Sequence, residues 1–137
     1  MMPEAAHETF TGHVFVYGTL RQGDDNDINR LSPAPRLVGP ATLCGTLYHL
    51  GAYPGVVLGG SLRVIGEVYA ISERLQQVLD EIEEIYPQQR DEYFKRVVPV
   101  AVKGEEIPCV VYEINPVYIA GRPVILTGDW VRSRHHF

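Results

Sequence analysis

Cysteine is scarce in this 137-residue chain, which contains only Cys44 and Cys109. Both lie in apolar, strand-like stretches, so we expect two small buried side chains. A zinc site would need closely spaced pairs of ligands, and the sequence has none. The sequence therefore predicts no bound metal and no cofactor, and a reduced, cytoplasmic location.

Long apolar runs and an excess of basic residues are also lacking. No run approaches the roughly 18 residues of a membrane span, and the start of the chain is too polar for a signal peptide. The formal net charge is −5, so there is no cationic surplus to neutralise phosphates. We expect neither a membrane nor a nucleic-acid partner, and nothing in the sequence indicates an oligomeric state.

The residues that are present suit one ordinary domain. The chain is 45% hydrophobic and 21% charged, which is enough apolar material for a core with a pocket. We expect a flexible N-terminal tail over residues 1–12, a single domain over 13–131 and a C-terminal tail over 132–137.

Short β-type runs, separated by glycine and proline, dominate the pattern. Gly59-Gly60-Ser61 is typical of a hairpin turn, and Pro99 predicts an edge position or a bulge. The runs are too closely spaced for repeated βαβ units. We therefore expect an α+β fold, a small curled mixed β-sheet or barrel of six to seven strands with one main helix. The expected strands cover residues 13–20, the region around 37, and residues 42–48, 56–58, 64–71, 93–102 and 109–114.

The helix is expected over residues 72–86. Ser72 is a suitable N-cap and Pro87 ends the pattern. Apolar residues recur between them at helical spacing. They are Leu75, Val78, Leu79, Ile82 and Ile85.

Four acids crowd the last turns of this helix. At about 100° per residue, Asp80 and Glu84 point away from the apolar stripe and should face water. Glu81 and Glu83 lie on the borders of the stripe. Partial burial there would raise the pKa of a carboxyl group toward the range useful for proton transfer. The periodicity does not choose between Glu81 and Glu83.

The first strand ends abruptly in Tyr17-Gly18-Thr19-Leu20. A glycine after a strand lets the backbone turn sharply and approach a ligand closely. Free N–H groups beyond the strand end can face an anion or a carbonyl oxygen, although such a turn can also be plain architecture. Arg21, which follows, is either a surface cation or a partner for an anionic substrate.

Six short motifs follow one another from about residue 13 to 130. They are Val14–Leu20, Gly51–Val57 with its Tyr-Pro turn, Val64–Tyr69 with Gly-Glu-Val-Tyr, Leu79–Glu83 with Leu-Asp-x-x-Glu, Tyr93–Val100, and Gly128-Asp129-Trp130. In this order they resemble the γ-glutamylcyclotransferase-like family, which includes the AIG2-like proteins.

The resemblance implies intramolecular aminolysis of a small γ-glutamyl substrate, which yields 5-oxoproline and a free amine. It assigns the general base and acid to Glu83 and substrate binding to the loop Tyr17, Gly18, Thr19 and Leu20. Tyr53 and Tyr93, like Tyr112, could line the pocket or simply pack in strands. The alternative is a non-catalytic module of the same fold that binds a γ-glutamyl ligand.

The chain departs from the family's pattern at three places. Glu84 stands where the family usually has glycine, and Arg96 comes one position late after Tyr93. An insertion-like stretch, residues 84–92, separates the helix from the next strand. Because of these departures, the resemblance does not determine the shape of the pocket rim or the identity of the leaving amine.

Overall fold

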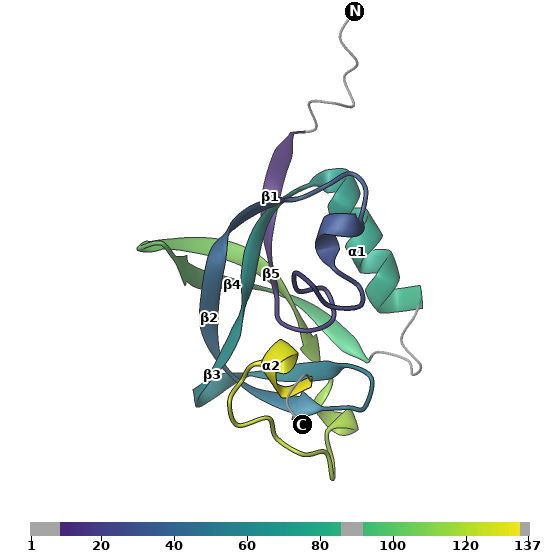
Figure 1. Cartoon of the computed structure of the whole chain (residues 1–137), viewed down its shortest axis with the longest axis vertical. Helices are drawn as coiled ribbons and strands as arrows, with labels where there is room; N and C mark the ends of the chain where they lie inside the picture. The colour runs from purple at the N-terminus through teal and green to yellow at the C-terminus, as the bar shows by residue number, and fades with distance from the viewer. Residues whose placement is uncertain (1–8, 86–91, 135–137) are drawn as a thin grey trace, which may run out of the picture.

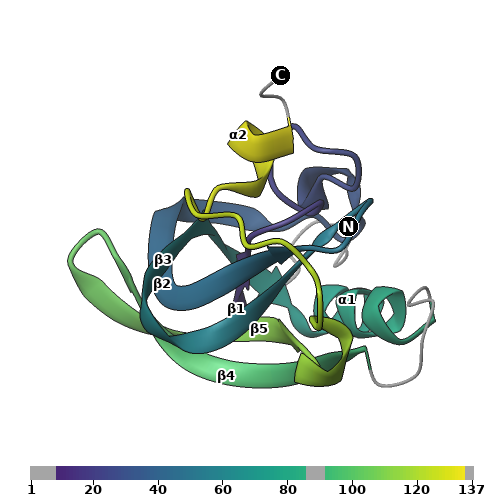
Figure 2. The same ribbon diagram turned by 90° about the horizontal axis from the view of Figure 1, so that it is seen from below.

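The computed structural model describes residues 9–85 and 92–134, and of residues 83–85 and 134 it describes the backbone alone. Five strands form one sheet in the order β2-β3-β1-β5-β4. Figures 1 and 2 show that the sheet curls around itself and that α1 lies against one side of it. The expected α+β class is therefore confirmed. The elements are β1 (Phe10–Val16), η2 (Ile28–Arg30), β2 (Arg36–His49), β3 (Pro54–Ser72), α1 (Glu73–Ile85), β4 (Tyr93–Val102), β5 (Glu105–Ile114), η3 (Pro116–Tyr118) and α2 (Trp130–Arg134).

The expected strand number was too high, because two pairs of expected strands are each one long strand. β2 runs unbroken through Gly39-Pro40 and Gly45. In β3, the residues at 59–62 do not turn the chain back: Gly45 pairs with Leu58, and Cys44 pairs with Arg63. Gly59 and Gly60 have φ of 100° and 81°. They form a bulge, which needs the same glycine conformations as the hairpin we expected.

The main helix is confirmed, including its cap. The Leu75 N–H donates to Ser72 Oγ at 3.1 Å. Leu75 and Leu79 are fully buried, and they share a cluster with Val14 of β1 and Ile71 of β3. The apolar stripe therefore packs α1 onto the centre of the sheet.

The second, larger core fills the inside of the curl. Phe15, Leu43, Val68 and Val111 are among its buried members. The curl brings the edge strands β2 and β4 together, since a Cβ on Gly39 would lie 3.4 Å from Val102 Cγ1. The edge position that Pro99 predicted for its strand is confirmed.

The two cysteines lie in different environments. Cys109 is buried in the core as expected, whereas Cys44 is exposed, and neither forms a disulfide. The expectation for Cys44 was wrong because β2 is an edge strand whose alternate side chains face solvent.

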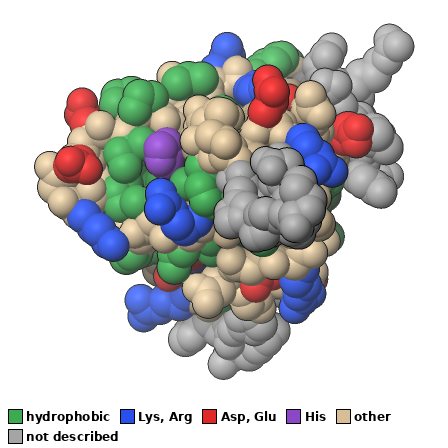
Figure 3. Space-filling model, turned by 90° about the horizontal axis from the view of Figure 1, so that it is seen from above, with side chains coloured by type: hydrophobic (Ala, Val, Ile, Leu, Met, Phe, Trp, Pro, Cys, Tyr) green, Lys and Arg blue, Asp and Glu red, His purple; other side chains and the backbone are tan. Residues whose placement is uncertain are grey.

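The surface mixes charges of both signs. Figure 3 shows basic and acidic side chains interspersed on the face seen from above. In the part of the chain that the structure describes, no helix has both the length and the apolar character needed to cross a membrane.

Candidate active site

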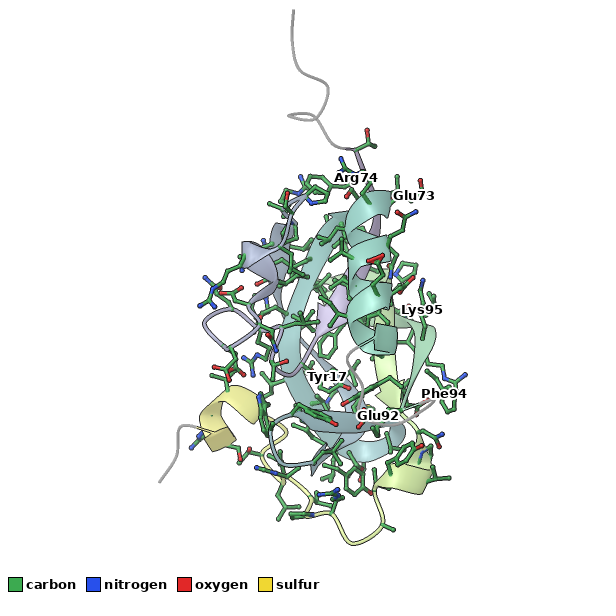
Figure 4. The ribbon with its side chains drawn as sticks, turned by 90° about the vertical axis from the view of Figure 1, so that its right-hand side faces the viewer. Tyr17, Glu73, Arg74, Glu92, Phe94 and Lys95 are labelled. Atoms are coloured by element: carbon green, nitrogen blue, oxygen red, sulfur yellow. The ribbon has the colours of Figure 1, made fainter. Side chains whose placement is uncertain are left out.

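A pocket of about 380 Å³ opens where β1 ends. It lies between the loop after β1, the turn before β3, the end of α1 and the start of β4. Figure 4 shows Tyr17 and Glu92 near one another below the end of α1, far from Glu73 and Arg74 at its beginning. The lining residues are Phe15, Val16, Tyr17, Gly18, Thr19, Leu20, Asp25, Asn26, Ala52, Tyr53, Pro54, Ile82, Glu92, Tyr93 and Tyr112.

The loop after β1 is a tight turn whose carbonyl groups are used within the protein. The Arg21 N–H donates to Gly18 O at 3.0 Å, and the Asn26 N–H donates to Thr19 O at 2.9 Å. Among the described residues, no hydrogen bond is donated by the N–H groups of Gly18, Thr19 or Leu20. Three consecutive amide donors in a pocket wall can bind a carboxylate or a polarised carbonyl oxygen.

Close packing and charge hold this loop in place. A Cβ on Gly18 would lie 2.8 Å from Pro54 Cγ, so only glycine allows the loop this close to the start of β3. Arg21 donates from Nε to Glu67 Oε2 at 2.6 Å and from Nη1 to Asp129 Oδ1 at 2.7 Å. Arg21 is therefore neither a surface cation nor a free substrate contact.

Tyr17 lines the pocket, but its hydroxyl forms hydrogen bonds to backbone groups of the sheet. It donates to Tyr112 O at 2.7 Å and accepts from the Val56 N–H at 3.3 Å. The side chain is buried. Its hydroxyl thus ties β3 and β5 to the strand end, and its ring forms part of the wall.

Two further tyrosines and an acid also line the pocket. The Tyr93 hydroxyl donates to Pro54 O at 2.8 Å, and the Tyr53 hydroxyl donates to Glu92 Oε2 at 2.6 Å. The two tyrosine rings lie 6.4 Å apart. Glu92 is only 2% exposed. No sequence signal marks Glu92, because an acid beside an aromatic residue at a strand start has no periodic pattern.

The outer face of α1 differs from the expectation at Asp80. Its carboxylate does not simply face water, since it accepts from Tyr112 Oη at 2.6 Å, Lys95 Nζ at 2.9 Å and Gln76 Nε2 at 2.8 Å. Burial alone would raise the pKa of Asp80, but hydrogen bonds from Tyr112, Lys95 and Gln76 outweigh it and lower the pKa. The contacts arise because β4 and β5 flank this side of the helix.

The last turn of α1 brings the chain to the pocket. Glu81 is exposed, whereas Ile82 lines the pocket. Glu83 follows Ile82 in the helix, but its side chain lies outside the described residues, as does most of the stretch 84–92. Its assigned role stays a prediction. The structure thus brings Tyr17, Gly18, Thr19, Leu20, Tyr53 and Tyr93 to one pocket.

Metal ligands do not gather in the described ranges, where no group of three His, Cys, Asp or Glu side chains could hold a metal ion.

Known proteins resemble most of the chain. The family described as "Gamma-glutamyl cyclotransferase, AIG2-like" matches residues 14–132. A gamma-L-glutamyl-butirosin B gamma-glutamyl cyclotransferase from Niallia circulans is 38% identical over 127 residues, which cover 91% of this chain and 74% of the relative. A gamma-glutamylaminecyclotransferase from Bos taurus is 35% identical over 113 residues, which cover 72% of this chain and 63% of the relative.

Solved structures agree in fold. YkqA from Bacillus subtilis superposes with a TM-score of 0.70 at 26% identity, covering 90% of this chain and 40% of that one. An AIG2-like protein from Mus musculus superposes with a TM-score of 0.66 at 24% identity, covering 84% of this chain and 86% of that one.

Proposed function

Because the chain belongs to the AIG2-like gamma-glutamyl cyclotransferase family, we propose that it is an enzyme that converts a γ-glutamyl amine or γ-glutamyl amino acid to 5-oxoproline and a free amine. One observation carries this proposal. The loop that the family motif predicts as substrate-binding forms a wall of a pocket, and three of its amide N–H groups make no hydrogen bond to any described residue.

The reaction needs no nucleophile from the protein. The α-amine of the γ-glutamyl group attacks its own γ-carbonyl carbon, which closes a five-membered ring. The bond between that carbon and the leaving nitrogen then breaks. Holding the substrate in the ring-closing conformation lowers the barrier, because little freedom remains to be lost in the transition state.

The amide donors of Gly18, Thr19 and Leu20 suit the charges of this substrate. They can bind the α-carboxylate or the oxyanion that develops on the γ-carbonyl oxygen. The pocket wall is rigid at this point because Gly18 packs directly on Pro54 and Arg21 is paired with two acids. Fixed donors of this kind require little rearrangement during the reaction.

Proton transfer is assigned to Glu83. It would accept a proton from the substrate ammonium and deliver it to the leaving nitrogen. The ring nitrogen loses a second proton after the attack, and this proton also ends on the released amine, so that no net proton is consumed. The support is its match to the family's catalytic glutamate and its place one residue after Ile82, which lines the pocket. Glu81, the other acid on the border of the stripe, is exposed.

The test is a panel of γ-glutamyl amines, including γ-glutamyl-ε-lysine, together with glutathione, assayed by chromatography for 5-oxoproline. We expect 5-oxoproline from at least one class, and the responsive class identifies the leaving amine. Release of glutamate would instead show an amidohydrolase. Binding without any product would show a non-catalytic module.

The matched variants are Glu83→Gln and Glu81→Gln. We expect Glu83→Gln to lower turnover by roughly 10²–10⁴-fold, the usual contribution of a general acid or base. Glu81→Gln should stay near the wild-type rate. Near wild-type turnover by a folded Glu83→Gln variant would refute the assignment.

A further inference from the structure

Glu92 is a buried carboxylate in the pocket wall with one unsatisfied oxygen. The residue is 2% exposed, and the Tyr53 hydroxyl donates to its Oε2 at 2.6 Å. Its Oε1 is buried and has no hydrogen-bond partner within the described chain. The backbone at this position is fixed, since the Asn115 N–H donates to Glu92 O at 2.7 Å.

Within the described part of the pocket, the Glu92 carboxylate has no basic side chain beside it. None of the described lining residues is a lysine, an arginine or a histidine. The described ion pairs that involve Arg21, Lys95 and Arg96 connect them to other acids. A buried carboxylate without a positive partner is unfavourable, so a cationic ligand would be favoured here.

We propose that Glu92 binds the α-ammonium group of the γ-glutamyl substrate through Oε1, an inference that rests on the proposed function. The α-amine of an amino acid is protonated at neutral pH, so the substrate brings a cation into the pocket. The amide donors of Gly18, Thr19 and Leu20 line the same pocket and suit the α-carboxylate. Donors and an acceptor in one pocket match both charges of an amino-acid head group.

Two segments that are distant in the sequence meet at Glu92. Glu92 ends the insertion-like stretch in which the chain departs from the family's pattern. Tyr53 anchors its second oxygen from the Tyr-Pro turn, 39 residues away in sequence. The charge is therefore held between two loops, and Tyr53 acts as a positioning residue for it.

The test compares two compounds that differ only in the α-amine. One is γ-glutamyl-ethylamide, and the other is the monoethylamide of glutaric acid, which lacks the amine and cannot cyclise. For wild type, Glu92→Gln and the control Glu81→Gln, we measure KM and kcat for the first compound and the inhibition constant for the second.

We expect Glu92→Gln to raise the KM of the amine-bearing compound tenfold or more and to change the inhibition constant of the deamino compound less than twofold. Glu81→Gln should change neither. Tyr53→Phe keeps the Glu92 carboxylate but removes the hydroxyl that positions it. It should therefore also affect the amine-bearing compound more than the deamino compound, with a smaller rise in KM than Glu92→Gln. Equal changes for both compounds, or no change for either, would overturn the proposal.

A third compound separates the α-ammonium from a charge on the leaving group. If Glu92→Gln weakens only γ-glutamyl-ε-lysine, whose leaving amine carries an amino-acid head group, Glu92 does not bind the α-ammonium. If wild type releases no 5-oxoproline from any compound, the proposed function fails. In that case, the affinities of wild type and Glu92→Gln for the amine-bearing and the deamino compound, measured by calorimetry, still decide the role of Glu92.

Discussion

Substitution of Gly18 tests whether close backbone packing builds the pocket. A Cβ at this position would lie 2.8 Å from Pro54 Cγ and 2.9 Å from Pro54 Cδ. The nearer distance is about 0.6 Å shorter than an ordinary contact of 3.4 Å. The proline ring cannot rotate away, because it begins β3 and its carbonyl oxygen accepts the Tyr93 hydroxyl. The loop itself must therefore move.

For Gly18→Val we expect a loss of about 1–3 kcal/mol in the free energy of unfolding, the usual effect of overpacking. This corresponds to a decrease in Tm of roughly 4–12 °C for a domain of this size. Movement of the loop also displaces the amide donors, so kcat/KM for 5-oxoproline release should fall by about tenfold or more at temperatures where the variant is folded.

The control is Thr19→Ser in the same loop. Thr19 Oγ1 accepts from Asn26 Nδ2 at 3.2 Å, and serine retains that hydroxyl. Thermal unfolding and urea titration measure stability, and chromatography measures product. A Gly18→Val variant whose Tm lies within about 2 °C of the Thr19→Ser variant would refute the packing argument.

Two further predictions concern single side chains. The lowered pKa of Asp80 gives stability that is present at neutral pH and is lost as the pH falls below about 4, from the ordinary carboxyl value through the lowered pKa of the folded state. The urea midpoint should therefore fall more steeply with acid in wild type than in Asp80→Asn. Equal slopes between about pH 5 and 3 would contradict this. Burial raises the pKa of Cys109 to about 11, whereas Cys44 is exposed. A thiol reagent at about pH 8 should therefore label Cys44 rapidly in the native protein. The Cys44→Ser variant should react only after unfolding, and rapid labelling of this variant would count against the burial of Cys109.

Features that depend on residues close together in the sequence were predicted correctly more often than the others. The helix was predicted because Ser72 and the apolar spacing that starts at Leu75 both act within a few residues. The strand number was overestimated because a glycine bulge inside β3 has the same sequence signature as a hairpin. Only the pairing of Cys44 with Arg63 distinguishes the two.

The site was harder to predict where its contacts are remote. Helical geometry placed Asp80 in water, and the strands packed beside α1 supply the partners that it has. Glu92 is hydrogen-bonded to Tyr53, and Arg21 forms ion pairs with Glu67 and Asp129. Such contacts join segments that no window along the sequence contains. The loop from Tyr17 to Leu20, which lines the pocket, could be singled out in the sequence because it is a continuous motif.

The bond between Arg21 and Asp129 has a consequence for biosynthesis. The two residues are 108 positions apart, and the neighbouring Gly128 O accepts from the Ile65 N–H. During translation, the loop after β1 leaves the ribosome long before its partner Asp129 has been made. The nascent chain can therefore form much of its sheet while the loop still lacks this restraint, which is added only after Asp129 has been made and has left the ribosome.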